Sequence, residues 1–276
     1  SRAGVIDVPA ERVKSMPALL GEADLVKTLQ QLPGVAVGTE GMTGLYVRGG
    51  GADENLYLLD GNPVYHVNHL LGFFSAFNPD AIKNTRFYKG SFPAEYGGRL
   101  SSVVDVRMND GNRQEYHGNI SVGLLSARAN LEGPIVKDRS SFNVSVRRTW
   151  LDLITGTALA IVNKNSDTKE SFGYHFFDIN AKVNHSFSER SRAYLSFYMG
   201  QDAFRQGSKE KHEDSDDMFL WRWGNLIGSA GWNYVFGQKL FGNLMVGYSR
   251  FRSHIRQEAK GYEIEGNRAE RQSIKR

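Results

Sequence analysis

From Glu115 toward the C-terminus, apolar and polar side chains alternate in one segment after another, a pattern that few folds accommodate. Within Arg192–Gly200 one face carries Ala193, Leu195, Phe197 and Met199, and the other carries Tyr194, Ser196, Tyr198 and Gly200. Because successive side chains of a strand point to opposite faces of its sheet, this alternation predicts strands with one apolar face. A soluble sheet alternates in the same way, so a soluble β domain and a membrane barrel both stay open at this point.

The lengths of these segments favour the barrel. We expect seven strands, at about residues 116–124, 126–134, 141–153, 174–187, 192–205, 221–236 and 240–256. Most of them exceed the roughly 5–6 residues of an ordinary strand and approach the roughly 9–11 residues with which a tilted strand crosses a membrane. Bacterial barrels have an even number of strands, from about 8 upward, so we expect the sequence to be incomplete.

The connections between these segments also alternate. We expect tight turns at Val136–Arg139, Ser188–Ser191 and Gly237–Lys239, and long polar loops at Thr155–Gly173 and Gln206–Leu220. Short turns on one side and long loops on the other are typical of outer-membrane barrels. Aromatic residues near strand ends are consistent with girdles at the membrane surface: Trp150, Phe176, Trp221, Trp223, Trp232, Tyr234 and Phe236.

The second long loop, Gln206–Leu220, is predicted to be extracellular, mobile and solvated. Its acidic residues Asp214, Asp216 and Asp217 have a spacing that calcium can use. Calcium loops usually add a glycine turn and a bidentate glutamate, so we predict no metal site here.

The first 110 residues have a different character and predict a small α/β domain with an open sheet. We expect one helix after Pro9, a second at Glu22–Gln31, and a one-turn helix at Pro79–Asn84. Short strands are expected at Gly4–Val8, Val35–Val37, Leu45–Arg48, Asn55–Leu59, Thr85–Lys89 and Val103–Arg107. The dipeptide Asp60-Gly61 predicts a tight turn. The predicted organisation is therefore this domain at residues 1–110, followed by barrel strands at residues 111–276.

Composition excludes several classes of function. The 34 basic and 30 acidic residues leave a net charge of +4 and are spread along the chain, whereas nucleic-acid binders gather their cations on one face. The chain has no cysteine, so it has no disulfides and no thiolate metal sites. No run of about 18 apolar residues occurs, so we expect no transmembrane helix. No signal peptide opens the sequence, so for an exported protein we expect this N-terminus to be mature or truncated.

Two motifs raise the question of chemistry. The segment Arg48–Gly51 follows a strand as phosphate loops do, but the Lys-Ser/Thr partner and the helix pattern are missing. His66 and His69 stand three residues apart, which suits a metal on a helix, but no third ligand is evident. Because no Ser–His–Asp grouping stands out either, we predict that the protein is not an enzyme and uses no cofactor.

Several motifs together resemble the plug domain of TonB-dependent outer-membrane receptors, over residues 5–135. They are Leu32–Val35, Val47–Gly49, Leu58–Val64, and Tyr88–Gly90 with Glu95–Gly98. Gly21–Asp24 and Phe77–Ile82 resemble the Bacteroidetes type in particular, and the spacing before Asp60-Gly61 differs from that of the SusC subgroup. The resemblance implies an α/β plug domain followed by antiparallel transmembrane strands of a barrel of about 22 strands.

The family also implies a function and partners. The resemblance implies active import of a scarce bulky nutrient, such as a metal chelate, cobalamin or an oligomer, across the outer membrane of a Gram-negative bacterium. The energy would come from TonB with ExbB and ExbD, and a surface lipoprotein is a further partner to consider. The alternative is a plugged barrel that serves as a surface interaction or assembly partner without import. Extraction from cells without detergent would instead favour a soluble α/β protein.

In this family two plug loops reach the external vestibule, and here they correspond to Gly50–Glu54 and Asn62–Asn78. The predicted ligand contacts are Asp53, Glu54, Tyr65, His66, His69, Phe73 and Phe74. For the second loop the alternative is packing against the barrel wall. Polar contacts between plug and barrel are expected from Arg48, Arg86, Glu95 and Arg99, which could otherwise be ordinary solvated charges.

Overall fold

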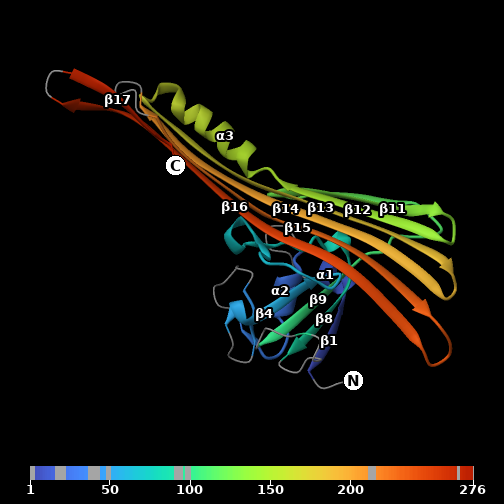
Figure 1. Cartoon of the computed structure of the whole chain (residues 1–276). Helices are drawn as coiled ribbons and strands as arrows, with labels where there is room; N and C mark the ends of the chain where they lie inside the picture. The colour runs from blue at the N-terminus through green and yellow to red at the C-terminus, as the bar shows by residue number, and fades with distance from the viewer. Residues whose placement is uncertain are drawn as a thin grey trace.

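A computed structural model describes residues 4–15, 23–36, 44–47, 51–89, 96, 101–210, 216–265 and 268–275. It consists of a small N-terminal domain and a long antiparallel sheet. Figure 1 shows the domain against one face of the sheet and a helix, α3, on the opposite face. The last strand of the domain's sheet ends at Met108 and the first strand of the long sheet begins at His117.

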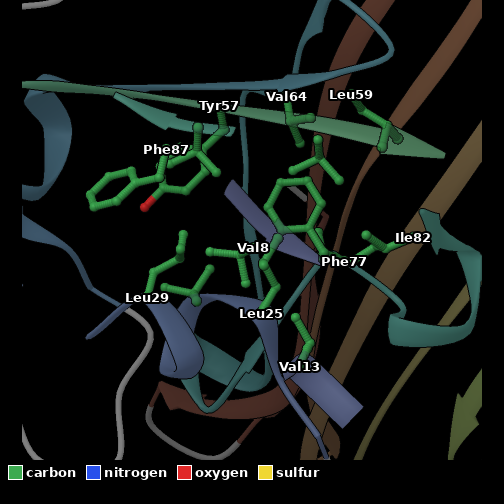
Figure 2. Packing of buried hydrophobic residues seen from close by; sticks show 14 of the residues in the cluster. Val8, Val13, Leu25, Leu29, Tyr57, Leu59, Val64, Phe77, Ile82 and Phe87 are labelled. Carbon is green, nitrogen blue, oxygen red and sulfur yellow. The ribbon is translucent and has the colours of Figure 1, made fainter. Parts of the chain in front are cut away.

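The N-terminal domain contains a five-stranded sheet in the order β1-β8-β9-β4-β5. The strands are β1 (Val5–Pro9), β4 (Asn55–Leu59), β5 (Asn62–Pro63), β8 (Ile82–Lys89) and β9 (Ser102–Met108). Only β4 and β9 pair in parallel; the other neighbours are antiparallel. Two short helices, α1 (Ala10–Ser15) and α2 (Leu25–Gln30), cover the sheet, and Figure 2 shows their side chains packed against those of the strands.

Short elements complete the domain. They are β2 (Val35–Ala36), β3 (Tyr46–Val47), β6 (Asn68–His69), β7 (Phe74–Ser75), and the 3-10 turns η1 (Ala52–Glu54), η2 (Leu70–Gly72) and η3 (Pro79–Ala81). The predicted turn is confirmed: Asp60 and Gly61 have positive φ angles of 45° and 81° and join β4 to β5. Helix α2 begins later than Glu22 because the Asp24 carboxylate caps it, accepting a hydrogen bond from the Lys27 amide at 3.1 Å.

The long sheet has eight strands among the described residues, each paired antiparallel with its neighbour in sequence. They are β10 (His117–Val122), β11 (Ser126–Val136), β12 (Ser140–Thr149), β13 (Thr168–Ser188), β14 (Ser191–Glu210), β15 (Asp216–Val235), β16 (Phe241–Glu265) and β17 (Arg268–Lys275). Seven of them lie where the alternation predicts strands. The eighth, β17, was not predicted, and β13 to β16 are longer than expected, at 20 to 25 residues.

The two faces of this sheet differ as the alternation predicts. Leu195 and Phe197 are 65% and 40% exposed on the face away from the N-terminal domain. Ser196 and Tyr198 are only 9% and 1% exposed, because they face the domain. Around them the domain-facing side is strongly polar: Asn143, Ser145, Arg147, Asp178, Asn180, Lys182, Asn184 and Asp202 are all buried there. A polar inner face and an apolar outer face are typical of outer-membrane barrels.

Two loop predictions are wrong. The segment expected as a polar loop after residue 155 contains helix α3 (Leu151–Val162) and the 3-10 turn η4 (Asn163–Asn165). Its residues 153–162 are uncharged and contain no proline, so nothing prevents a helix. The loop Gln206–Leu220 is largely strand, since β14 and β15 extend into it; Asp214 lies outside the described residues.

The aromatic residues predicted to lie in the girdles fall into an exposed group and a buried group. Trp232 and Phe236 are 47% and 60% exposed, whereas Phe176 and Trp223 are buried against the N-terminal domain. Phe176 and Trp223 therefore do not belong to an outer girdle, because their strand positions point inward. None of the helices in the described ranges is long and apolar enough to cross a membrane.

Candidate functional site

The N-terminal domain meets the long sheet through a buried group of charged side chains. His69 is the last residue of strand β6 of the domain, and its ring lies between Asp178 on β13 and Asp202 on β14. The His69 Nδ1 lies 2.5 Å from Asp202 Oδ1, and its Nε2 lies 3.4 Å from Asp178 Oδ2. All three side chains are almost fully buried. One residue of the domain thus bridges two strands of the sheet.

Arg147 on β12 completes the charge balance of this group. Its Nε and Nη2 donate to Asp178 Oδ2 at 2.9 Å and 2.6 Å. The same Nη2 donates to the carbonyl oxygen of Ser75 on β7 at 2.9 Å, so this arginine also ties the sheet to the domain. Arg147 and Asp178 are directly opposite each other on neighbouring strands. Such charge-assisted hydrogen bonds are among the stronger contacts in proteins.

The remaining carboxylate oxygen of Asp202 accepts two hydrogen bonds. One comes from the Tyr174 hydroxyl on β13, and the other from the Leu70 amide of η2 at 3.2 Å. We call His69, Arg147, Tyr174, Asp178 and Asp202 the interface cluster.

Phe176 supports this cluster from one side. Its ring stacks on His69, with centroids 4.3 Å apart and planes 3° from parallel. The Arg147 guanidinium lies 5.1 Å from the centre of the same ring, and Phe74 packs nearby at 5.7 Å. Stacking and cation–π contacts of this kind restrict the rotamers of both charged groups. The domain is therefore held in one orientation on the sheet.

The carboxylates determine the charge of His69. Burial alone would lower the pKa of His69, but Asp202 and Asp178 outweigh it and raise the pKa above its ordinary value. When His69 is protonated, two cations face two carboxylates and the buried cluster is neutral. The nearby His66 has a lowered pKa, first because it is partly buried and also because His69 repels a second positive charge.

We predict that attachment of segment 68–75 weakens as pH rises. The folded-state pKa of His69 is raised above its ordinary value of about 6.5, so its contribution is complete below about pH 6.5 and is lost as pH rises through the folded pKa. Hydrogen exchange, corrected for intrinsic rates, should show falling protection of the Leu70 amide over this range. The other groups facing His69 are Asp178, Asp202, Arg147, Tyr174, Tyr198 and His66. A His69→Gln variant with the same pH dependence would contradict the assignment.

A second set of contacts fastens the domain to strands β11 and β13 of the sheet. Lys182 on β13 lies 3.3 Å from Asp60 and 3.0 Å from Asp110, and it donates to the Met108 carbonyl at 3.2 Å. Asp110 also pairs with Lys83 at 2.7 Å. Burial would raise the pKa of Asp110, but the two lysines lower it. Arg128 of β11 also reaches the domain and pairs with Asp80 at 2.9 Å.

The structure places the predicted ligand contacts in two different environments. Asp53, Tyr65 and Phe73 are exposed, with Tyr65 at 62%, and Glu54 is half-buried. His69 and Phe74 are buried against the sheet, which corresponds to the packing alternative for this loop. His66 is intermediate: its ring stacks on Phe251 at 5.5 Å and its carbonyl accepts from Asn225 at 2.6 Å. The described residues contain no group of three or more histidines and carboxylates placed to hold a metal.

Of the four predicted polar contacts, only Arg86 lies among the described residues. It is exposed, its Nε lies 3.4 Å from Asp7 of β1, and it lines a cavity between the domain and the sheet. Arg48, Glu95 and Arg99 fall outside the described ranges. Four charged residues of this interface were not predicted from the sequence: Arg147, Asp178, Lys182 and Asp202. The sequence does contain an indication of their role, because each is a charged residue at an inward position of an alternating strand.

Comparison with known proteins agrees with this arrangement. Residues 7–104 match the family model for the TonB-dependent receptor plug domain. Among the curated proteins compared with the chain, none matches.

Three solved structures show the same fold. They are the siderophore receptor PirA from Acinetobacter baumannii (15% identity, TM-score 0.51), a variant of the ferric enterobactin receptor PfeA from Pseudomonas aeruginosa (16%, 0.50), and the outer-membrane transporter YddB from Escherichia coli (10%, 0.52). The matches cover 99%, 94% and 96% of this chain but only 47%, 46% and 46% of those chains. The chain therefore spans about half the length of the structures that it matches. It combines a plug domain with an antiparallel sheet like the barrels of TonB-dependent receptors.

Proposed function

We propose that this chain is part of an energised importer in the outer membrane of a Gram-negative bacterium. The observation that carries the proposal is a plug domain fixed by buried ion pairs to the polar face of an amphipathic antiparallel sheet. A large barrel would leak without such a domain. The proposed substrate is a scarce bulky nutrient, and an iron chelate is the first choice because two of the similar structures are siderophore receptors. Cobalamin and oligomers remain within the proposal.

The polar interface suits a domain that must move. A dry hydrophobic contact between plug and wall would resist separation through the full area that it hides from water. Ion pairs and hydrogen bonds can instead exchange their partners for water when the plug shifts. The outer membrane has no ATP supply, so the work must come from a periplasmic partner, which we propose to be TonB driven by ExbB and ExbD.

Uptake of radiolabelled ferric enterobactin tests the importer. Cells producing the protein should accumulate the label, cells lacking TonB should not, and the protein should leave the membrane only with detergent. Binding of the label without accumulation in TonB-containing cells would favour the alternative, a plugged barrel that acts as a surface interaction partner. Release without detergent would contradict both.

The finer assignments rest on the sequence motifs. We propose a receptor of the Bacteroidetes type and outside the SusC subgroup, from the motifs Gly21–Asp24 and Phe77–Ile82 and the spacing before Asp60-Gly61. A surface lipoprotein is proposed as an additional partner. We also propose that the protein is not an enzyme, in line with the transport and receptor functions of the similar structures.

We propose that the exposed part of the plug loops contacts the ligand, and we predict the effect of truncating it. Tyr65→Ala with His66→Ala should lower uptake at limiting ligand by about tenfold or more, because an aromatic surface and a hydrogen-bonding ring are both removed. The matched control is Tyr116→Ala with His117→Ala, a second Tyr-His pair that lies at the start of the long sheet. Uptake equal to wild type, at equal surface abundance, would show that the loop only packs.

A further inference from the structure

The outward face of the long sheet changes character along its strands. Near the tight turns this face is apolar, with exposed side chains at Phe187, Leu195, Phe197, Leu244, Val246 and Tyr248. On β13 the outward positions from Phe187 to Phe177 are apolar except for His185, and they span about the length that a tilted strand needs to cross a membrane. Toward the long connections the outward positions of β16 become basic at Arg250, Arg252, His254 and Arg256, and β15 contributes Arg222 beside them.

The basic positions surround a groove on this outward face. Its volume is about 430 Å³, and it is lined by Gln201 of β14, Arg222 and Gly224 of β15, and Arg250, Arg252 and His254 of β16. The strand register places Arg222 opposite His254, Gly224 opposite Arg252, and Leu226 opposite Arg250. Gly224 contributes no side chain to the groove, and a β-carbon at this position would lie 2.3 Å from the backbone carbonyl oxygen of Gly200. Met199 and Leu226 line its edge nearest the apolar band.

Three of the basic residues that line the groove have no acidic partner in the part of the chain that the structure describes. Within the described ranges, Arg222, Arg250 and Arg252 form no ion pair with a carboxylate. Arg256, two residues further along β16, does pair with Glu258. Three like charges on adjacent strands repel one another, and an anion between them would remove that repulsion. The guanidinium group matches phosphate oxygens with two parallel hydrogen bonds, so phosphate is the anion that fits best.

We infer that this groove binds the phosphorylated headgroup of a lipid in the outer leaflet, whose acyl chains lie along Met199 and Leu226. The inference rests on the proposed function, because that places the sheet in a membrane. Barrel proteins have their short turns on the periplasmic side, and the groove lies at the opposite edge of the apolar band. Arginine is costly at the middle of a bilayer and tolerated at its surface, which agrees with the position of the three residues.

The test uses the protein in dodecyl maltoside and bisphosphorylated lipid A as the probe, with binding measured by native mass spectrometry. Replacing Arg222, Arg250 and Arg252 together by glutamine should weaken binding about 100-fold, at about fivefold for each arginine. The control is the triple replacement of Arg12, Arg139 and Arg190 by glutamine, which removes the same charge from exposed positions elsewhere. It should bind the lipid like the wild type.

Three results would overturn the inference. They are equal binding of lipid A whose phosphates have been removed, an equal loss in the control variant, and complete displacement by inorganic phosphate at matched concentration, which would indicate a site for soluble anions. None of these affects detergent extraction or TonB-dependent uptake, so the inference can fail while the proposed function stands. Conversely, loss of uptake without loss of lipid binding would affect only the proposed function.

Discussion

The proposed import function predicts that a disulfide between positions 62 and 247 will reduce uptake to the level of cells without the protein. Asn62 of β5 lies over Gly247 of β16: a β-carbon built at Gly247 would be 2.5 Å from Asn62 Cγ. Since that Cγ is bonded to the Asn62 Cβ, the two β-carbons of an Asn62→Cys/Gly247→Cys variant would lie within about 4 Å, as disulfides require. The chain has no other cysteine, so the bond would tie the plug domain to the sheet without competing pairs.

This effect is measured as uptake of radiolabelled ferric enterobactin before and after treatment with dithiothreitol. Reduction of the disulfide should restore uptake. The matched control is Ser196→Cys/Ser229→Cys, because those hydroxyl oxygens lie 2.5 Å apart on the neighbouring strands β14 and β15. That bond crosses within the sheet and leaves the plug untied, so uptake should be normal. Full uptake with the 62–247 bond closed would mean that β5 stays on the sheet throughout transport.

Arg147→Met should release the plug domain more easily than any replacement of an exposed charge. Methionine fills a similar volume, but it leaves the buried Asp178 with His69 as its remaining cationic partner. Breaking a buried ion pair from one side costs about 3–5 kcal/mol, because the abandoned charge stays out of water. Trp223 packs at the interface, so its fluorescence during urea titration, measured in a background where the other three tryptophans are replaced by phenylalanine, reports release of the domain.

The neighbouring residue supplies the control. Arg148 pairs with Asp152 at 2.7 Å on the exposed outer side, and Arg148→Met should cost no more than about 1 kcal/mol. In the double variant Arg147→Met/Asp178→Leu neither charge is left alone, so its loss should be smaller than that of Arg147→Met. Equal effects of Arg147→Met and Arg148→Met would show that the interface cluster does not hold the domain.

The sequence predicts the parts of this fold that depend on neighbouring residues. Alternation in Arg192–Gly200 identifies which side chains face the plug, since the period fixes the face once a strand exists. Asp60-Gly61 predicts its turn because both residues tolerate positive φ. Helix α2 is predicted by its apolar face, although Asp24 moves its start.

Two features were not predicted from the sequence: the contacts between residues that are distant in the chain, and helix α3. His69 and Asp202 are 133 residues apart in the chain, and no local pattern indicates that they meet. Consequently the packing and ligand-binding alternatives for His69 could not be separated by sequence alone. Helix α3 was missed for a different reason, because the uncharged stretch 153–162 was grouped with the polar residues that follow it.

The pairing of β1 determines how the plug responds to a mechanical load. This strand is the edge of the domain's sheet and the first element of the described chain, with β8 as its single partner. Five residue pairs, from Val5 opposite Tyr88 to Pro9 opposite Asn84, join them. A force on the N-terminal end is carried by these pairs first, and detaching β1 withdraws Val8 from the core while β8, β9 and β4 remain paired. The plug can therefore yield in stages, losing one strand and part of its core before its central sheet is broken.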